Sequence, residues 1–152
     1  MHLESSMGVR QTVERVWAFF VDPANLPKWD RSVATVIVPS PNNVGVGSTF
    51  DTLAPSGMRM SYRVTEFVPK QRISIRLVNS NMFKEALWTF KFEPIAGAVR
   101  IICRVDLIPR LRYSFLIPVL LLTYKAAFRR DLTYLKQALE HGQSLIPQPE
   151  PK

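Results

Sequence analysis

Residues 112–141 read RYSFLIPVLLLTYKAAFRRDLTYLKQALEH, and the rest of the chain is arranged around this segment. Apolar side chains recur in it every three or four residues, a spacing that aligns them on one face of an α-helix. The stripe positions are Ile117, Leu121, Tyr124, Phe128, Leu132, Leu135 and Leu139. The spacing predicts one long helix that packs its stripe against another part of the chain.

The two halves of this helix differ in how much of their surface is apolar. In the second half, charged side chains lie off the stripe, namely Lys125, Arg129, Arg130, Asp131, Lys136 and Glu140. In the first half, residues 115–122 add apolar surface on every side, and such a helix is buried or covered by something. Pro118 lies in this half, where it either ends a first short turn or kinks the helix.

The composition is that of a single globular domain. The chain has 152 residues, of which 47% are hydrophobic, enough for a core without disulfides. The one cysteine, Cys103, excludes an intramolecular disulfide, and no secretory signal is visible at the N-terminus. The longest apolar run, 115–122, is far shorter than the roughly 20 residues of a membrane span. We expect one domain over residues 1–142, a disordered Pro-rich tail over 143–152, and a cytoplasmic protein.

The charge of the chain raises the question of a nucleic-acid partner. The net charge is +8 and the pI is about 10.1. A dedicated nucleic-acid binder concentrates its basic residues, whereas here the longest basic run is Arg129-Arg130. We therefore expect no nucleic-acid partner.

Upstream of the long helix, the periodicity indicates two short helices and then strands. Residues 2–9 alternate weakly as a first strand, and the short helices follow at 13–21 and 23–28. Further strands are predicted at 33–38, 48–53, 58–65, 72–77, 85–93 and 99–107, with a turn at 39–43. Each strand is apolar on one face and charged on the other, which is typical of an antiparallel sheet solvated on one side.

The apolar sheet face and the apolar helix stripe must bury each other. We therefore predict an α+β fold in which a curved antiparallel sheet of six to seven strands wraps around the long C-terminal helix. Strongly twisted strands curl, and a curled sheet that holds one helix can leave a hollow between the two.

Several short motifs follow one another along the chain. They are Val13-x-x-Val16-Trp17-Ala18-Phe19-Phe20-Val21-Asp22-Pro23, Leu26-Pro27-x-Trp29, Gly45-x-Gly47-Ser48, Val64-Thr65-Glu66-Phe67-Val68-Pro69 and Leu135-Lys136-x-x-Leu139-Glu140. In this order they resemble the START-like (SRPBCC) superfamily, which includes polyketide cyclase/dehydrase and Bet v 1-like proteins. The resemblance covers residues 8–141 and implies a helix-grip fold. It also implies a cavity between sheet and helix that binds hydrophobic or amphipathic molecules, with a minority of members acting as aromatase/cyclases.

The inward-facing side chains can be plain core or the wall of such a cavity. An apolar lining with a few polar tips is typical of a small-molecule site, and the resemblance favours the cavity. The predicted wall residues are Met60, Tyr62, Ile75, Trp88, Phe90, Cys103, Ile117, Leu121 and Tyr124. The predicted function is binding or transport of a hydrophobic or amphipathic small molecule such as a lipid, polyketide or aromatic. The alternative is a polyketide cyclase/dehydrase-like enzyme.

The sequence proposes no catalytic or metal-binding set. His2 and His141 lie at opposite ends of the chain, and with one cysteine they do not have the spacing of a zinc site. Asp51 and Glu66 are the carboxylate candidates for a general acid or base. Strand alternation puts Glu66 on the inner phase with Tyr62, but it lies at the end of its strand beside a Val-Pro turn, so we expect it to be exposed at the rim. We predict no cofactor and leave catalysis open.

The apolar first half of the long helix suggests a third function, as an interaction module. Basic residues flank it, namely Arg110, Arg112, Lys125, Arg129 and Arg130. Apolar segments with basic flanks are typical of contact with an anionic membrane. A homodimer through Phe115–Leu122 explains the same surface equally well.

Overall fold

The computed structural model describes residues 1–38 and 44–141. In chain order the elements are β1 (His2–Val9), α1 (Val13–Val21), the 3₁₀ helix η1 (Pro23–Lys28), β2 (Thr35–Ile37), β3 (Thr49–Leu53), β4 (Arg59–Val68), β5 (Arg72–Val78), β6 (Phe83–Ile95), β7 (Ala98–Pro109), the 3₁₀ helix η2 (Leu111–Leu116) and α2 (Ile117–His141). The predicted turn at 39–43 and the predicted tail at 143–152 lie outside the described residues.

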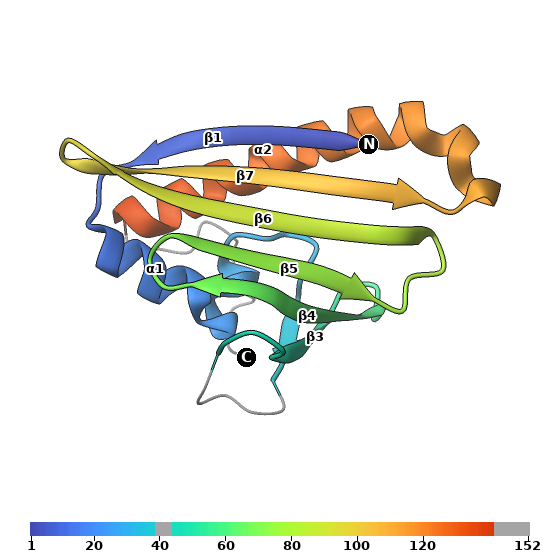
Figure 1. Ribbon diagram of the computed structural model, residues 1–152, viewed down its shortest axis with the longest axis horizontal. Helices are drawn as coiled ribbons and strands as arrows, with labels where there is room; N and C mark the ends of the chain where they lie inside the picture. The colour runs from blue at the N-terminus through green and yellow to red at the C-terminus, as the bar shows by residue number, and fades with distance from the viewer. Residues whose placement is uncertain (39–43, 142–152) are drawn as a thin grey trace, which may run out of the picture.

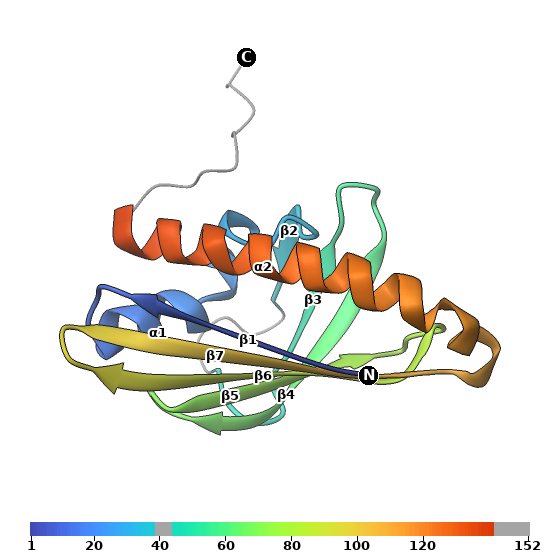
Figure 2. The same ribbon diagram turned by 90° about the horizontal axis from the view of Figure 1, so that it is seen from above.

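The strands form one seven-stranded antiparallel sheet in the order β1-β7-β6-β5-β4-β3-β2. The sheet curves, and α1 and α2 lie on the same side of it (Figures 1 and 2). The first and last strands pair, because β1 lies beside β7 at one edge of the sheet. This arrangement confirms the predicted α+β helix-grip fold, with two short helices after the first strand.

The two short helices begin at side chains that satisfy their first backbone N–H groups. Thr12 Oγ1 accepts a hydrogen bond from the Arg15 amide at 3.3 Å, which caps α1. Asp22 Oδ1 accepts one from the Ala24 amide at 3.0 Å, which caps η1. Pro23 then occupies the first turn of η1, where a missing N–H costs little. The second short helix is 3₁₀, which accommodates Pro27 inside it.

The closed part of the core lies where α1 and the second half of α2 pack on β6 and β7. Rings from α1 meet rings from β6, with Trp17 and Phe92 centroids 5.3 Å apart and those of Phe20 and Phe90 4.6 Å apart. Fully buried side chains in this part include Val9, Val99 and Ile101, and Leu135 joins them from α2. Burial of such side chains is the main favourable term in folding, so this packing contributes strongly to the stability of the molecule.

The long helix begins later than the spacing predicts. Residues Leu111–Leu116 form η2, and α2 starts at Ile117. Pro118 therefore lies in the first turn of α2, where its missing N–H breaks no helical hydrogen bond. Of the two roles predicted for Pro118, the structure shows the end of a short turn rather than a kink.

A β-bulge in β4 changes which side chains face the helix. The register between β4 and β5 shifts between Val64 and Glu66, so Val64 pairs with Ile75 and Glu66 pairs with Ser74. The extra residue reverses the alternation. The phase that alternation assigned to Glu66 is therefore wrong, because Glu66 lies on the convex face; its expected exposure agrees with the structure, in which its side chain is partly exposed.

Candidate functional site

The concave face of the sheet carries a row of aromatic rings on β3, β4 and β6. Phe50 and Tyr62 stack, with centroids 5.2 Å apart and ring planes at 14°. Trp88 lies edge-on to Tyr62 at 5.9 Å. Phe50 pairs directly with Tyr62 across β3 and β4, and Ile75 lies between β4 and β6, paired with Trp88. The sheet register alone thus assembles a flat aromatic wall from three strands.

These rings are only half-buried although they face the long helix. Phe50, Met60, Tyr62, Ile75 and Trp88 all keep partial solvent exposure. The same face of the sheet is closed further along, where Phe90 is 5% exposed and Cys103 is fully buried. Solvent therefore reaches the aromatic wall but not the neighbouring core.

The first half of α2 covers this wall loosely. Leu120, Tyr124 and Phe128 pack against the core without being buried. The Tyr124 ring contacts the Phe83 ring of β6 edge-on at 6.4 Å. The buried residues of α2 all lie in its second half and are Leu132, Leu135, Ala138 and Leu139.

Polar groups gather beside Tyr62 on this otherwise apolar face. Burial, together with the negative charge of Asp30, raises the pKa of Tyr62 to about 12. The Tyr62 hydroxyl donates a weak hydrogen bond to the Met60 sulfur at 3.8 Å. Thr52 is fully buried, and its hydroxyl interacts with Tyr62 without forming a well-aligned hydrogen bond to any described residue. The half-buried phenol is thus within reach of a polar ligand group, whereas the Thr52 hydroxyl is enclosed.

Two carboxyl groups are linked to this region: Asp30, from the segment after η1, acts on Tyr62, and Asp131 of α2 interacts with Asp30. Burial raises the pKa of Asp30, while hydrogen bonds from the Ser32 amide at 2.9 Å and hydroxyl at 2.6 Å lower it in part. Burial also raises the pKa of Asp131 to about 6, and the charge of Asp30 contributes to the rise. The two aspartates therefore interact although they are far apart in sequence.

The sequence pattern identified neither aspartate as part of a site. Helical spacing puts Asp131 off the apolar stripe, but it is half-buried in the structure. A signal was present, because Asp131 lies two helical turns after Tyr124 and therefore shares its face. Asp30 follows the Leu26-Pro27-x-Trp29 motif, and nothing in its spacing marks it as inward-facing.

The structure distributes the nine predicted wall residues over two environments. Phe90 and Cys103 lie side by side in the closed core, paired across β6 and β7. Burial raises the pKa of the Cys103 thiol well above its ordinary value, so it stays protonated. The half-buried members are Met60, Tyr62, Ile75, Trp88, Ile117, Leu121 and Tyr124. Ile117 and Leu121 lie at the start of α2, and Leu120 rather than Leu121 packs against the core.

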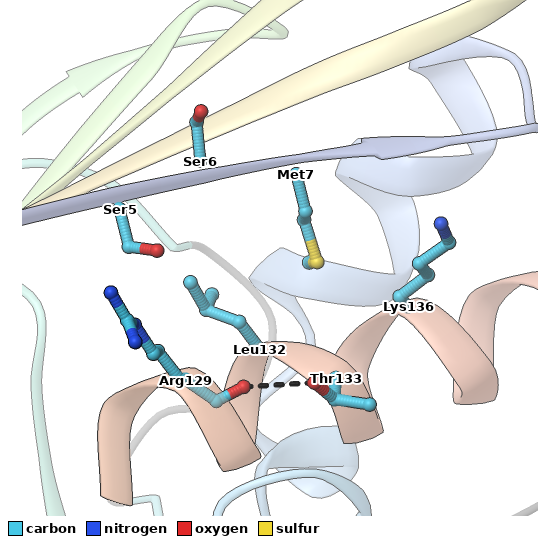
Figure 3. A pocket seen from close by; sticks show the side chains of 7 residues that line it. All are labelled: Ser5, Ser6, Met7, Arg129, Leu132, Thr133 and Lys136. Carbon is cyan, nitrogen blue, oxygen red and sulfur yellow. Dashed lines mark hydrogen bonds between the residues drawn. The ribbon is translucent and has the colours of Figure 1, made fainter. Parts of the chain in front are cut away.

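The two most evident hollows of the described surface lie away from the aromatic wall, and none of the nine residues lines them. One, of about 210 Å³, lies between β1 and α2 (Figure 3). Ser5 and Met7 point from β1 towards Arg129 and Lys136 on α2 in this view. The other, of about 320 Å³, lies beside the β5 and β6 ends and includes Arg72 and Lys91 in its lining. The first is smaller than typical ligand sites of roughly 300–1,000 Å³, and the second is at the lower end of that range.

The two carboxylates nominated from sequence both lie in ion pairs on the convex face. Asp51 pairs with Arg59, and hydrogen bonds from Ser61 and Arg59 lower the pKa of Asp51. Glu66 pairs with Arg72 at 2.6 Å and accepts a hydrogen bond from Ser74 at 3.0 Å. Neither faces the aromatic wall. Within 1–38 and 44–141, no group of three or more His, Cys, Asp or Glu side chains is arranged to hold a metal ion.

Fold and site together define a helix-grip protein with an aromatic concave face. The chain belongs to the family described as polyketide cyclase / dehydrase and lipid transport, whose model matches residues 1–140. No curated protein matches the chain significantly.

Solved structures share the fold at low sequence identity. The protein TTHA0849 from Thermus thermophilus has a TM-score of 0.74 at 14% identity, over 91% of this chain and 97% of that one. The di-domain ARO/CYC BexL from the BE-7585A biosynthetic pathway has a TM-score of 0.74 at 16% identity, over 90% of this chain and 45% of that one. DynU16, from the dynemicin biosynthetic locus, has a TM-score of 0.71 at 17% identity, over 94% of this chain and 48% of that one.

Proposed function

We propose that the protein binds a hydrophobic or amphipathic small molecule between the aromatic wall and the first half of α2. The observation that carries the proposal is the partial exposure of rings that face the interior. Tyr62 and Trp88 lie on the concave face, yet both remain half-buried. Removing aromatic ring surface from water is favourable. An apolar ligand that covers these two rings therefore binds with the hydrophobic free energy of ring surface that the folded chain leaves exposed.

The polar groups beside Tyr62 can orient such a ligand. Among the described residues, the Tyr62 phenol makes a long contact to the Met60 sulfur and a weak interaction with the Thr52 hydroxyl, and neither is a well-formed hydrogen bond. A ligand hydroxyl or carbonyl placed here forms a hydrogen bond with the Tyr62 phenol, while its apolar part lies on Trp88. A few polar groups in an apolar lining are what fixes ligand orientation in small-molecule sites.

Entry of the ligand requires movement of α2. The first half of the helix, Ile117–Arg130, contributes no buried residue, whereas Leu132, Leu135 and Leu139 hold the second half in the core. Separation of the first half from the sheet therefore costs far less than separation of the second half. Family membership supports the same role, because the family description includes lipid transport.

Titration with a fluorescent fatty acid or aromatic probe tests the proposal. The wild type is expected to bind the probe, and Trp88→Ala is expected to raise the Kd by roughly tenfold because it removes a large apolar contact. Leu87→Ala is the matched control, since Leu87 is the neighbouring half-buried residue on the opposite face of β6. Its Kd is expected to stay within about twofold of the wild type.

Two outcomes contradict the proposal. One is a wild-type protein that binds no apolar probe. The other is an equal loss of affinity in the Trp88→Ala and Leu87→Ala variants, since that would place the probe away from the concave face. Circular dichroism of each variant confirms that it is folded.

A cyclase-like enzyme is the second candidate, and the pKa of Asp131, raised to about 6, favours it. Aldol cyclisation of a poly-β-ketone needs a base that takes a proton from the carbon between two ketones. It also needs an acid that protonates the carbonyl oxygen under attack, after which water is lost. Ionised Asp131 suits the first role, and Tyr62, whose pKa is about 12, suits the second.

The Asp131→Asn variant tests this second candidate. With a linear poly-β-ketone substrate, absorbance of the cyclised aromatic product is expected to form at a rate roughly 100-fold lower than in the wild type. The wild-type rate should rise as Asp131, with its pKa of about 6, ionises. Probe binding should be retained in the variant. Absence of any turnover by the wild type contradicts the enzymatic role and leaves the binding role intact.

A further inference from the structure

The end of the molecule away from α1 carries a cluster of exposed apolar side chains on η2 and the first turns of α2. Leu111, Phe115, Val119 and Leu122 are 91%, 75%, 59% and 75% exposed, and we call this set the apolar edge. In Figures 1 and 2, η2 and the start of α2 extend past the end of β7, clear of the sheet. Soluble proteins rarely leave large apolar side chains clustered in water unless something covers them.

The segment that carries the apolar edge has basic residues and no acidic ones. Residues 107–130 contain five basic residues and no acidic one. Arg110, Arg112 and Lys125 form no ion pair with any residue that the structure describes. Arg110 donates to the Ser80 carbonyl at 3.3 Å and Arg112 to the Asn81 carbonyl at 3.2 Å. These bonds orient both guanidinium groups but leave their charge uncompensated.

We propose that the apolar edge inserts into the surface of an anionic phospholipid bilayer, with Arg110, Arg112 and Lys125 at the level of the lipid phosphates. Apolar side chains bordered by unpaired basic residues fit the surface of an anionic bilayer, because the acyl chains are apolar and the headgroups next to them are negatively charged. The partner is a bilayer rather than a second copy of the chain. A symmetric dimer through this edge brings the same uncompensated cations of both copies together.

The helix lies in the membrane surface and does not cross the bilayer. The helical stretch Leu111–His141 contains an 18-residue window with a mean hydropathy of 1.3, none of it buried, so length and composition alone allow a span. However, Leu132, Leu135 and Leu139 belong to the core. A crossing helix would have to pull these residues out of the domain, whereas insertion of the apolar edge leaves the fold intact.

Sedimentation with lipid vesicles tests the proposal. The protein is expected to sediment with vesicles of phosphatidylcholine mixed with phosphatidylglycerol, to be released by added salt, and to ignore pure phosphatidylcholine. The Phe115→Ser/Leu122→Ser variant is expected to lose binding by roughly tenfold or more. The matched control is Val46→Ser/Ile95→Ser, which removes two apolar side chains that are 69% and 49% exposed elsewhere on the molecule. This control is expected to bind like the wild type.

Charge reversal separates insertion from general attraction. Arg112→Glu/Lys125→Glu is expected to abolish binding, whereas Lys91→Glu/Arg100→Glu, which makes the same change in net charge on the convex face, is expected to weaken it only slightly. Equal losses in the two variants would overturn the proposal, because binding would then follow net charge alone. Binding unaffected by Phe115→Ser/Leu122→Ser would overturn it as well.

Light scattering without lipid decides between the bilayer and a second copy. We expect a monomer for both the wild type and the Phe115→Ser/Leu122→Ser variant. A wild-type dimer that this variant converts to a monomer would assign the apolar edge to self-association and overturn the membrane proposal.

Discussion

The carboxyl group of Asp131 keeps its proton to a higher pH than an exposed aspartate does. Burial is the main cause of the rise in its pKa to about 6, and the charge of Asp30 is the second. Arg130 offsets only part of this effect, because its Nε lies 3.7 Å from the carboxylate. In the unfolded chain these influences disappear, and the pKa returns to about 3.8. The protein thus carries, at neutral pH, a charge that its own fold disfavours.

This difference in pKa predicts how stability depends on pH. As the pH rises from 3.8 to 6, the unfolded chain releases the proton before the folded protein does, so the free energy of unfolding falls. Above the folded-state pKa of about 6 the loss is complete. Asp131→Asn is therefore expected to raise the free energy of unfolding at about pH 8 by about 2 kcal/mol, and by much less near pH 4.

Urea denaturation at the two pH values measures this effect. Glu93→Gln, an exposed carboxylate on the convex side, is the control and should change stability by only a few tenths of a kcal/mol at either pH. A stabilisation by Asp131→Asn that is equal at both pH values would argue against the raised pKa.

At the scale of elements, α2 is held firmly at one end and loosely at the other. Its second half is anchored by Leu132, Leu135 and Leu139, and Gln11 Nε2 donates to the Leu139 carbonyl at 3.1 Å. Its first half is joined to the sheet by half-buried contacts such as that between Tyr124 and Phe83. The second half of α2 therefore anchors the helix in the core, and the first half is the movable cover of the proposed site.

Amide hydrogen exchange is expected to reveal this asymmetry. Amides of residues 122–130 should exchange at least about tenfold faster than those of residues 133–139, because opening of the first half exposes little buried surface. A bound apolar probe should slow exchange in 122–130 and leave 133–139 unchanged. Uniform protection along the whole helix would contradict a movable cover.

At the scale of the whole molecule, the two ends of the fold serve different purposes. The end that contains α1, with the rings of Trp17, Phe20 and Phe92 in contact, is closed and supplies stability. The opposite end contains η2 and the apolar edge, and it lies beyond the sheet (Figure 1). The aromatic wall lies between the two ends. If both proposals hold, a ligand taken from a bilayer has a short path to Trp88 beneath the first half of α2.

The sequence by itself determined the elements and the class of fold. The period of the apolar residues identified the strands and the long helix, and one apolar face on each required that sheet and helix pack together. It also brought Tyr62, Trp88 and Tyr124 to the inward face, because alternation along a strand and the helical stripe follow from local geometry.

Only the tertiary structure decided how these faces are used. The bulge after Val64 moved Glu66 to the convex face and Phe67 to the concave one. Its mark in the sequence is one change in the phase of the apolar residues, from Val64 to Phe67, and at the end of a strand such a change does not by itself show that the strand continues. The charge of Asp30, which contributes to the raised pKa of Asp131, acts between segments that are distant in the chain. The exposure of Phe115 depends on where the sheet ends. Periodicity records which side of an element is apolar, whereas burial and pKa depend on which other elements reach that side.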